Sequence, residues 1–271
     1  MSYYEELGLN REPFSTSPDP EFFYQSSEHK TALHRLEIAI RLRRGLSLIL
    51  GDVGTGKTTL SRTFLQNIGN EDNFIFKLIL DPTYKSEFQF LSNLTKMFGV
   101  TPAFRSTLDY KEAIEKYLFR KGVDENKTII LIIDEGQKLN HSFLEILRTL
   151  LNYETNEYKL LQLIVLGQME LLPRIKRIRN FYDRVTLKYI INPLDEMETE
   201  EMIRFRLLKS GLNSGRDIFT QEAIKLIYEY TLGYPRRIAV MSHNALEYIV
   251  MNDKKYVDGS IIKEIAQKEV I

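Results

Sequence analysis

Short apolar runs alternate with stretches of helical spacing through the first two thirds of the chain. The runs at 128–133 and 160–166 are mainly aliphatic, which is typical of strands that are buried on both faces of a sheet. Further runs predict strands at 46–50, 74–80 and 185–191. Apolar residues at helical spacing predict the intervening helices, at 27–44, 58–68, 86–98, 110–119 and 142–153. This alternation predicts an α/β fold in which helices cover both faces of a parallel sheet.

The two ends of the chain follow different patterns. Residues 1–26 combine three prolines with several aromatic residues, which excludes a long helix and predicts an extended segment pinned by aromatic anchors. After Pro193 the spacing is helical only, with helices predicted at 196–209, 221–231, 236–252 and 260–268. We therefore expect an N-terminal segment (1–26), an α/β core (27–193) and a C-terminal helical lid domain (194–271).

The composition narrows the chemistry that such a fold can carry. The 37 Lys and Arg residues balance 37 Asp and Glu residues, which argues against a protein that coats nucleic acid through its overall charge. The chain has no cysteine, and its four histidines never have the spacing of a helical metal pair, so a metal ion would have to be bound by oxygen. No apolar run approaches the roughly 20 residues of a membrane-spanning helix, and the N-terminus lacks a secretory pattern. We therefore expect a soluble chain without a transmembrane segment.

One segment matches a phosphate-binding motif in both sequence and context. Gly51-Asp52-Val53-Gly54-Thr55-Gly56-Lys57-Thr58 has the pattern G-x-x-x-x-G-K-[ST] and lies between a predicted strand and a predicted helix. Its glycines allow backbone N–H groups to surround a phosphate, and the N-terminus of the next helix adds positive potential. In such a loop Lys57 would reach the β and γ phosphates of a nucleotide, and the Thr58 hydroxyl would bind Mg²⁺.

Two carboxylates follow the most apolar predicted strand. Asp134 and Glu135 come directly after the run 129–133, and the carboxyl ends of strands border the ligand crevice in open α/β sheets. We expect Asp134 to hold Mg²⁺ through water, and Glu135 to orient and polarise the attacking water as a general base. The alternative is an ordinary acidic pair at a helix N-terminus, which the phosphate-binding motif upstream disfavours.

Two arginine-containing segments and one glutamine are further candidates for contacts with the γ phosphate. Gln168 follows the strand 160–166 and would lie beside the acidic pair if the two strands are neighbours. Arg184, with Arg179 and Arg177 as second choices, could neutralise charge on the γ phosphoryl group in a neighbouring subunit. The segment Gly233-Tyr234-Pro235-Arg236-Arg237 opens a helix with two positive charges, which is locally unfavourable unless an anion lies nearby.

Each of these positions also has a simpler interpretation. Gln168 would otherwise be a polar residue at a helix start, and Arg236 would otherwise form an ion pair within the protein. The basic stretch would otherwise be a solvated loop or a contact to DNA phosphates. Its members are Arg174, Lys176, Arg177, Arg179, Arg184 and Lys188.

Taken in order, these motifs resemble those of the AAA+ ATPases, and in particular the ATPase domain of the general secretion pathway protein A (GspA, also called ExeA) family. The resemblance spans nearly the whole chain. Besides the phosphate-binding motif, it rests on Glu6-Leu7-Gly8-Leu9, Pro13-Phe14, Pro18-Asp19-Pro20, Leu131-Ile132-Ile133-Asp134-Glu135-Gly136-Gln137, Leu166-Gly167-Gln168-Met169-Glu170-Leu171, Asp183-Arg184-Val185 and Gly233 to Arg237. The chain departs from the family at Gly136, where Ala is usual, and at Met169, where Pro is common.

The resemblance implies a P-loop fold with a helical lid and an ATP hydrolase that uses Mg²⁺. It implies the following roles: nucleotide binding by Gly51 to Thr59 (Walker A), metal binding and catalysis by Asp134 and Glu135 (Walker B), sensor 1 at Gln168, an arginine finger at Arg184 and sensor 2 at Arg236. It also implies a homo-oligomer, a ring or a filament, in which the arginine acts in trans. The expected setting is cytoplasmic, with recruitment to the inner membrane as an option, in secretion or cell-envelope assembly.

Transposition ATPases of the TnsC and MuB kind are similar in the same core and lid. These relatives form ATP-dependent filaments on DNA, and the basic stretch 174–188 is the feature of this sequence that favours that function. The alternative to a secretion ATPase is therefore an ATP-dependent DNA-binding regulator. The sequence leaves the choice of partner, duplex DNA or a protein, open.

Overall fold

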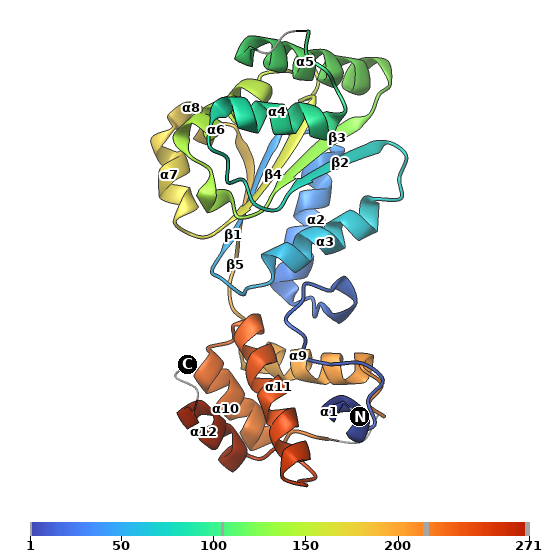
Figure 1. Cartoon of the computed structure of the whole chain (residues 1–271), viewed down its shortest axis with the longest axis vertical. Helices are drawn as coiled ribbons and strands as arrows, with labels where there is room; N and C mark the ends of the chain where they lie inside the picture. Colours follow the sequence, from blue (N-terminus) through green and yellow to red (C-terminus); the bar gives the residue numbers. More distant parts are fainter. Residues whose placement is uncertain (1, 104–105, 214–216, 269–271) are drawn as a thin grey trace. The chain divides into compact units, whose positions relative to one another are not determined.

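The computed structural model describes residues 2–103, 106–213 and 217–268 (Figure 1). The chain forms two compact units. The larger unit contains His29–Val53 and Leu60–Ile191, and the smaller contains Met1–Glu28, Gly54–Thr59 and Asn192–Ile271. Within the described ranges, no helix is both long enough and apolar enough to cross a membrane.

A five-stranded, fully parallel sheet forms the centre of the larger unit. Its strands are β1 (Leu46–Gly51), β2 (Phe74–Ile79), β3 (Thr128–Ile133), β4 (Leu161–Gly167) and β5 (Val185–Ile191). The strand order is β2-β3-β4-β1-β5, so β4 lies between the strand that precedes the phosphate-binding motif and the strand that precedes the acidic pair. Leu50 is paired with Gly167, and Ile133 with Val165. The carboxyl ends of β1, β3 and β4 therefore lie side by side at one edge of the sheet.

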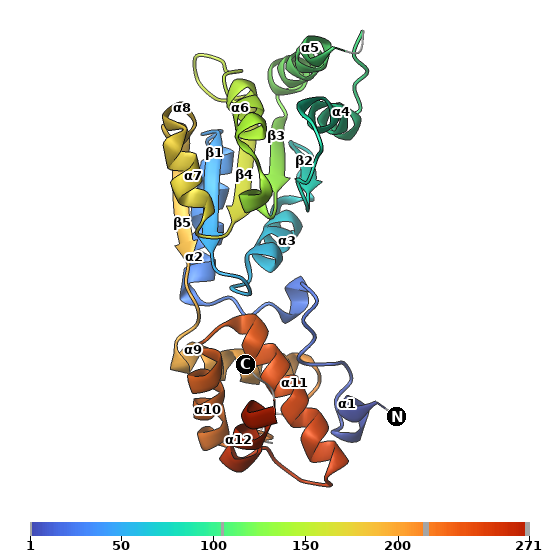
Figure 2. The same ribbon diagram turned by 60° about the vertical axis from the view of Figure 1, so that its left-hand side comes forward.

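Helices cover both faces of this sheet, which confirms the predicted α/β class (Figure 2). One face carries α2 (Ser27–Arg41) and α3 (Lys57–Ile68), and the other carries α4 (Glu87–Phe98), α5 (Thr107–Phe119), α6 (His141–Leu150), α7 (Leu171–Arg177) and α8 (Arg179–Tyr182). Strands β1, β3 and β4 are buried along their whole length. This burial explains why their sequences are continuous apolar runs rather than alternating ones.

The stretch between β4 and β5 differs from the sequence-based prediction. No helix was predicted between the strand at 160–166 and that at 185–191, where the structure has α7 and α8. Both are short, and they are anchored by buried side chains, Leu171 and Ile175 in α7 and Phe181 in α8, which is too few apolar positions to give a recognisable helical period. At the start of α4, Ser86 and Gln89 have the spacing of a capping box, which forms only in part. Ser86 Oγ accepts the Gln89 N–H at 3.2 Å, but Gln89 Oε1 accepts the N–H of Lys85 at 2.7 Å instead of that of Ser86.

The smaller unit is helical and includes the N-terminal segment. It contains α1 (Tyr3–Glu6), a 3₁₀ turn at Pro20–Phe22, α9 (Glu196–Lys209), α10 (Gln221–Thr231), α11 (Pro235–Met251) and α12 (Gly259–Lys268). Leu7, Leu9 and Phe14 belong to the same buried cluster as the apolar faces of α9 to α12. Phe14 is 1% exposed and meets Phe219 edge-on, with 6.0 Å between ring centroids. The aromatic residues of the N-terminus thus anchor it against the helices of this unit.

Candidate nucleotide-binding and hydrolysis site

The phosphate-binding motif forms a loop between β1 and α3. Gly54 and Gly56 adopt left-handed backbone conformations, with φ of +85° and +94°, which residues with a Cβ atom rarely reach. Helix α3 begins at Lys57, which is 9% exposed, and Thr55 is fully buried. Left-handed glycines that lead into a helix N-terminus are the arrangement in which backbone N–H groups can surround an anion.

Arg236 contacts this loop within the smaller unit. Its backbone N–H donates to the Gly54 carbonyl at 3.3 Å. A Cβ atom built on Gly54 would lie 2.9 Å from Arg236 Cβ and 3.8 Å from its Cδ, so the stem of the arginine side chain lies against the glycine. The next residue, Arg237, stacks on the Tyr234 ring at 5.1 Å instead. The two adjacent arginines therefore have different surroundings.

The acidic pair follows β3 with an unusual backbone turn. Asp134 is 4% exposed, and its N–H donates to the Ile79 carbonyl at 2.8 Å, which extends the sheet by one residue. Glu135 has φ +52° and ψ +37°, a left-handed conformation that is uncommon for a residue with a side chain and is found most often where function requires it. Its N–H donates to Asp134 Oδ1 at 2.8 Å. The two neighbouring residues differ in exposure, because Asp134 is buried and Glu135 is partly exposed.

Gln137 joins the acidic pair to the end of β4. Its Nε2 donates to Glu135 Oε2 at 2.7 Å, and its Oε1 accepts the backbone N–H of Gln168 at 3.2 Å. Because β3 and β4 are neighbours, Gln168 lies beside the acidic pair, as the sequence analysis expected under that condition. Sequence reasoning did not single out Gln137, although it stands two residues after the candidate base, where its side chain can reach back across the turn.

The short helix η3 (Gly136–Lys138) is held closely against β4. A Cβ atom on Gly136 would lie 2.4 Å from Val165 Cγ1 and 3.0 Å from the Leu166 carbonyl oxygen, so the Ala that is usual here would not fit without a shift. Arg174 donates to the carbonyls of Gln137 and Leu139. Arg174, a member of the basic stretch, therefore stabilises this turn.

An ion pair lies next to the acidic turn. Lys138 Nζ is 2.9 Å from Asp81 Oδ2, and the hydrogen bond to Asp81 raises the pKa of Lys138. The pKa of Asp81 is lowered, first by its hydrogen bond from Thr83 and then by that from Lys138. Both groups are therefore charged at neutral pH, and this lysine is paired rather than available to a ligand.

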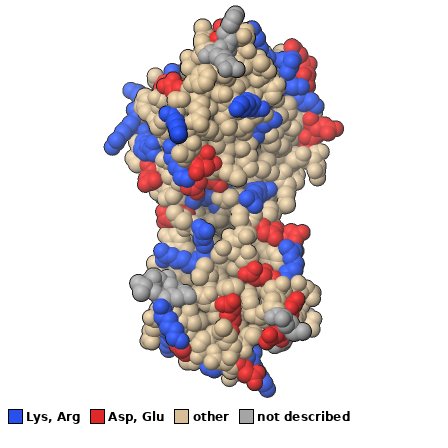
Figure 3. Space-filling model, viewed as in Figure 1, with Lys and Arg blue, Asp and Glu red and all other residues tan. Residues whose placement is uncertain are grey.

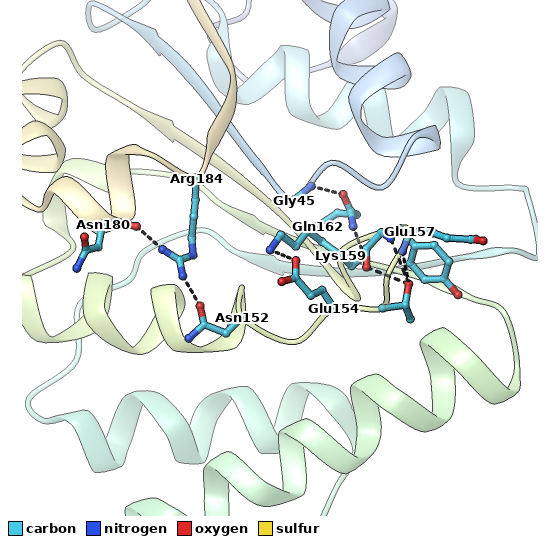
Figure 4. A network of polar contacts seen from close by, with 10 residues as sticks. Gly45, Asn152, Glu154, Glu157, Lys159, Gln162, Asn180 and Arg184 are labelled. Atoms are coloured by element: carbon cyan, nitrogen blue, oxygen red, sulfur yellow. Dashed lines mark hydrogen bonds and ion pairs between the residues drawn. The ribbon is translucent and has the colours of Figure 1, made fainter.

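Arg184 lies at the amino ends of the strands, opposite the carboxyl ends that lead into the phosphate-binding motif and the acidic pair. It precedes β5, and Val185 is paired with Leu46 at the start of β1. Strand β1 has six residues. At a rise of about 3.3 Å per residue, Arg184 is therefore roughly 20 Å from the carboxyl end of β1 along the sheet. Its guanidinium donates to the Asn180 carbonyl and to Asn152 Oδ1 (Figure 4). Arg177 and Arg179 are exposed, at the end of α7 and the start of α8.

The comparison with known sequences agrees with these features. Residues 40–175 match the model of the AAA domain family. General secretion pathway protein A of Aeromonas hydrophila is 34% identical over 269 residues, which cover 96% of this chain and 47% of that protein. The chain therefore spans about half the length of this curated relative.

Solved structures share the fold at low sequence identity. Cdc6p of Pyrobaculum aerophilum has a TM-score of 0.71 and 16% identity over 94% of this chain and 70% of that one. The ORC2 protein of Aeropyrum pernix has a TM-score of 0.69 and 17% identity, with coverage of 96% and 72%. RuvB of Thermotoga maritima, a Holliday junction branch migration motor, has a TM-score of 0.58 and 13% identity, with coverage of 92% and 73%. With half of its length matched by the family model, the chain belongs to the AAA domain family of ATPases.

Proposed function

We propose that residues 51–59 bind the triphosphate of ATP, that Thr58 and Asp134 hold Mg²⁺, and that Glu135 is the general base for hydrolysis. The observation that carries this proposal is the phosphate-binding loop itself, with left-handed Gly54 and Gly56 leading into α3. N–H groups and the buried Lys57 suit an anionic ligand.

The donor set fits Mg²⁺. A threonine hydroxyl and a carboxylate are oxygen ligands, and Mg²⁺ in nucleotide sites is commonly held by one or two such groups together with phosphate and water. When bound, Mg²⁺ would supply positive charge that stabilises the phosphate oxygens. Asp134 would bind it through water, and Glu135 would orient the attacking water and accept its proton. Gln168 follows the neighbouring strand, in the position of a γ-phosphate sensor, and Arg236 would contact the phosphates from the loop that it touches.

We propose further that Arg184 acts on the ATP of a neighbouring subunit. Within its own subunit it is roughly 20 Å along the sheet from the end of β1, farther than an arginine side chain extends. Asn152 and Asn180 hold its guanidinium, so it is presented as a prearranged group. Arg184 lies at the amino ends of the strands and can reach a phosphate only in another subunit. This role therefore requires an oligomer, either a ring or a filament.

Mixing two inactive variants tests this arrangement. Lys57→Ala subunits would lack ATP but still offer Arg184, and Arg184→Ala subunits would bind ATP but lack the finger. Each variant alone is expected to hydrolyse ATP at least about 100-fold more slowly than wild type. The Lys57 variant is slow because it binds Mg·ATP weakly, and the Arg184 variant because an arginine finger contributes on the order of a thousandfold or more. A mixture is expected to regain a readily measured fraction of the wild-type phosphate release.

A double variant provides the control for mixing. When the Lys57→Ala subunits also carry Arg184→Ala, no site in the mixture has a finger, so no activity should return. If the first mixture is no more active than its separate components, Arg184 does not act in trans.

The biological setting that we propose is secretion or cell-envelope assembly. Support comes from the identity of 34% to General secretion pathway protein A across nearly all of this chain. ATP hydrolysis would alter the contacts of Arg236 with the phosphate-binding loop and thereby change the arrangement of α11, which begins at Pro235. A partner that binds the helical unit would receive this change.

Four exposed cations favour duplex DNA as a second candidate partner. Of the basic stretch, Arg174 and Arg184 donate to groups of the protein, whereas Lys176, Arg177, Arg179 and Lys188 are exposed. On the face of the larger unit seen in Figure 3, basic and acidic side chains are interspersed, so such binding would depend on these few residues.

A salt titration tests the DNA candidate. Four phosphate contacts predict an affinity that falls on the order of 100-fold between 50 and 200 mM salt. Fluorescence anisotropy with a labelled duplex and a non-hydrolysable ATP analogue measures this change. The triple replacement of Lys176, Arg177 and Arg179 by alanine should flatten the salt dependence, and affinity that is absent or insensitive to salt would eliminate DNA as a partner.

A further inference from the structure

We infer that Gln137 is a positioning residue for hydrolysis, whose side-chain amide orients the Glu135 carboxylate and joins it to the end of β4. The inference rests on the proposed role of Glu135 as the general base. Gln137 is 9% exposed, and its side chain bonds at both ends, to Glu135 and to the backbone of Gln168.

The chemistry of the two partners determines which way the amide faces. An ionised carboxylate only accepts hydrogen bonds, so the NH₂ group of Gln137 must face Glu135. A backbone N–H only donates, so the amide oxygen must face Gln168. The distances of 2.7 Å and 3.2 Å agree with this orientation. One planar group therefore fixes the positions of the candidate base and the neighbouring strand end relative to each other.

The turn that carries this amide is constrained on several sides. Arg174 donates to the Gln137 carbonyl, and Gly136 lies so close to β4 that even a Cβ atom would clash with Val165. The backbone of Glu135 is left-handed. With the backbone fixed, the hydrogen bond from Gln137 selects the orientation of the carboxylate. The bond goes to Oε2, and in this proposal the other oxygen, Oε1, accepts the hydrogen bond from the attacking water.

The same arrangement couples the base to the sensor position. A displacement of Gln168 would move the N–H that Gln137 accepts, and the rigid amide would transmit that displacement to Glu135. The presence of a γ phosphate beside β4 would thus affect the geometry of the base directly. A purely structural glutamine would tie backbone to backbone and would not contact the reactive carboxylate.

Two substitutions test the hydrogen bonds of Gln137 to Glu135 and Gln168. Gln137→Glu keeps the shape and an oxygen for the Gln168 N–H, but an ionised carboxylate cannot donate to Glu135 and repels it. Gln137→Met keeps the length and loses both bonds. Both variants are expected to lower kcat on the order of 10- to 100-fold, the usual effect of losing a group that orients an active-site ligand. The Kd for Mg·ATP should change by no more than about twofold, because neither variant alters the phosphate-binding loop.

Gln162 offers a matched control. It is a fully buried glutamine on β4 that also bonds at both ends, accepting the Gly45 N–H at 2.8 Å and donating to the Lys159 carbonyl at 2.7 Å (Figure 4). Gln162→Met should lower the thermal midpoint without a selective loss of kcat. The comparison shows how much of the Gln137 effect comes from losing two buried hydrogen bonds in general.

A double-mutant cycle gives the deciding readout. In a Glu135→Gln background the base is absent, so Gln137→Met should cause no further loss of hydrolysis. The inference would be overturned if the losses of the two substitutions multiply in the double variant. It would also be overturned if the Gln137 variants keep the wild-type kcat, or if their kcat falls only in proportion to the loss of folded protein. If Glu135→Gln itself hydrolyses ATP normally, the proposed base fails instead, which distinguishes the two hypotheses.

Discussion

Replacing Glu135 with glutamine is expected to lower the rate of ATP hydrolysis by about 100- to 10,000-fold, the range that a general base contributes, while ATP still binds. The substitution preserves the shape of the side chain and leaves an oxygen that can accept the hydrogen bond from Gln137 Nε2. The amide cannot accept a proton from water, so the chemical step is lost selectively. Single-turnover phosphate release measures the rate, and calorimetry with Mg·ATP measures the affinity.

The control for this variant is a carboxylate far from the strand ends. Glu112 is exposed on α5, and Glu112→Gln removes one negative charge without touching the turn after β3. It should hydrolyse ATP at the wild-type rate. Normal turnover by Glu135→Gln would contradict the assignment of Glu135 as the base, and equal losses in both variants would indicate a general effect of charge.

Replacing Lys57 with alanine is expected to weaken Mg·ATP binding on the order of 10- to 100-fold or more. Charge-assisted hydrogen bonds contribute about 1.5–3 kcal/mol each, which corresponds to this range of affinity. Lys57 as a residue is 9% exposed at the start of α3, and attraction between charges is weakly screened at buried positions. Isothermal titration calorimetry with Mg·ATP measures the loss directly.

An exposed lysine in the helical unit serves as the matched control. The Lys263 side chain is 54% exposed and lies 3.6 Å from Glu222, so Lys263→Ala should bind Mg·ATP as the wild type does. The thermal midpoint of Lys57→Ala without nucleotide should stay near that of the wild type, which shows that the loss of binding does not come from unfolding. Undiminished affinity in the Lys57 variant would refute the assignment of the phosphate-binding loop.

Most of the secondary structure follows from local patterns. The strands at 128–133 and 185–191 and the helices at 196–209 and 221–231 have the predicted bounds, because long apolar periods and caps such as Thr220 are properties of one segment. Helices α7 and α8 were not predicted, since each has too few buried positions to establish a period. Instead, α7 packs through Leu171 against Gly136 and Gly167, and α8 packs on α6.

The residues of the candidate site also differ in whether local sequence was enough to predict them. Motif spacing predicted the loop at Gly51 to Thr58 and the acids Asp134 and Glu135, because such motifs are continuous in sequence. The basic stretch looked uniform, yet Arg174 holds the carbonyls of η3 and Arg184 is held by two asparagines, while its other members are exposed. Arg174 and Arg184 each have a partner more than 30 positions away, Gln137 and Asn152, and sequence spacing does not encode such contacts.

By itself, the sequence determined the alternation of strands and helices, the glycine-rich loop between β1 and α3 and the presence of two acids after an apolar strand. These are features of single segments, in which side-chain period and backbone freedom are local properties. Only the tertiary structure decided that β4 lies between β1 and β3, that Gln137 joins Glu135 to Gln168, and that Arg184 lies at the far edge of the sheet. Strand order and side-chain partners depend on which distant surfaces pack together, and many pairings of the same apolar strands would bury similar area.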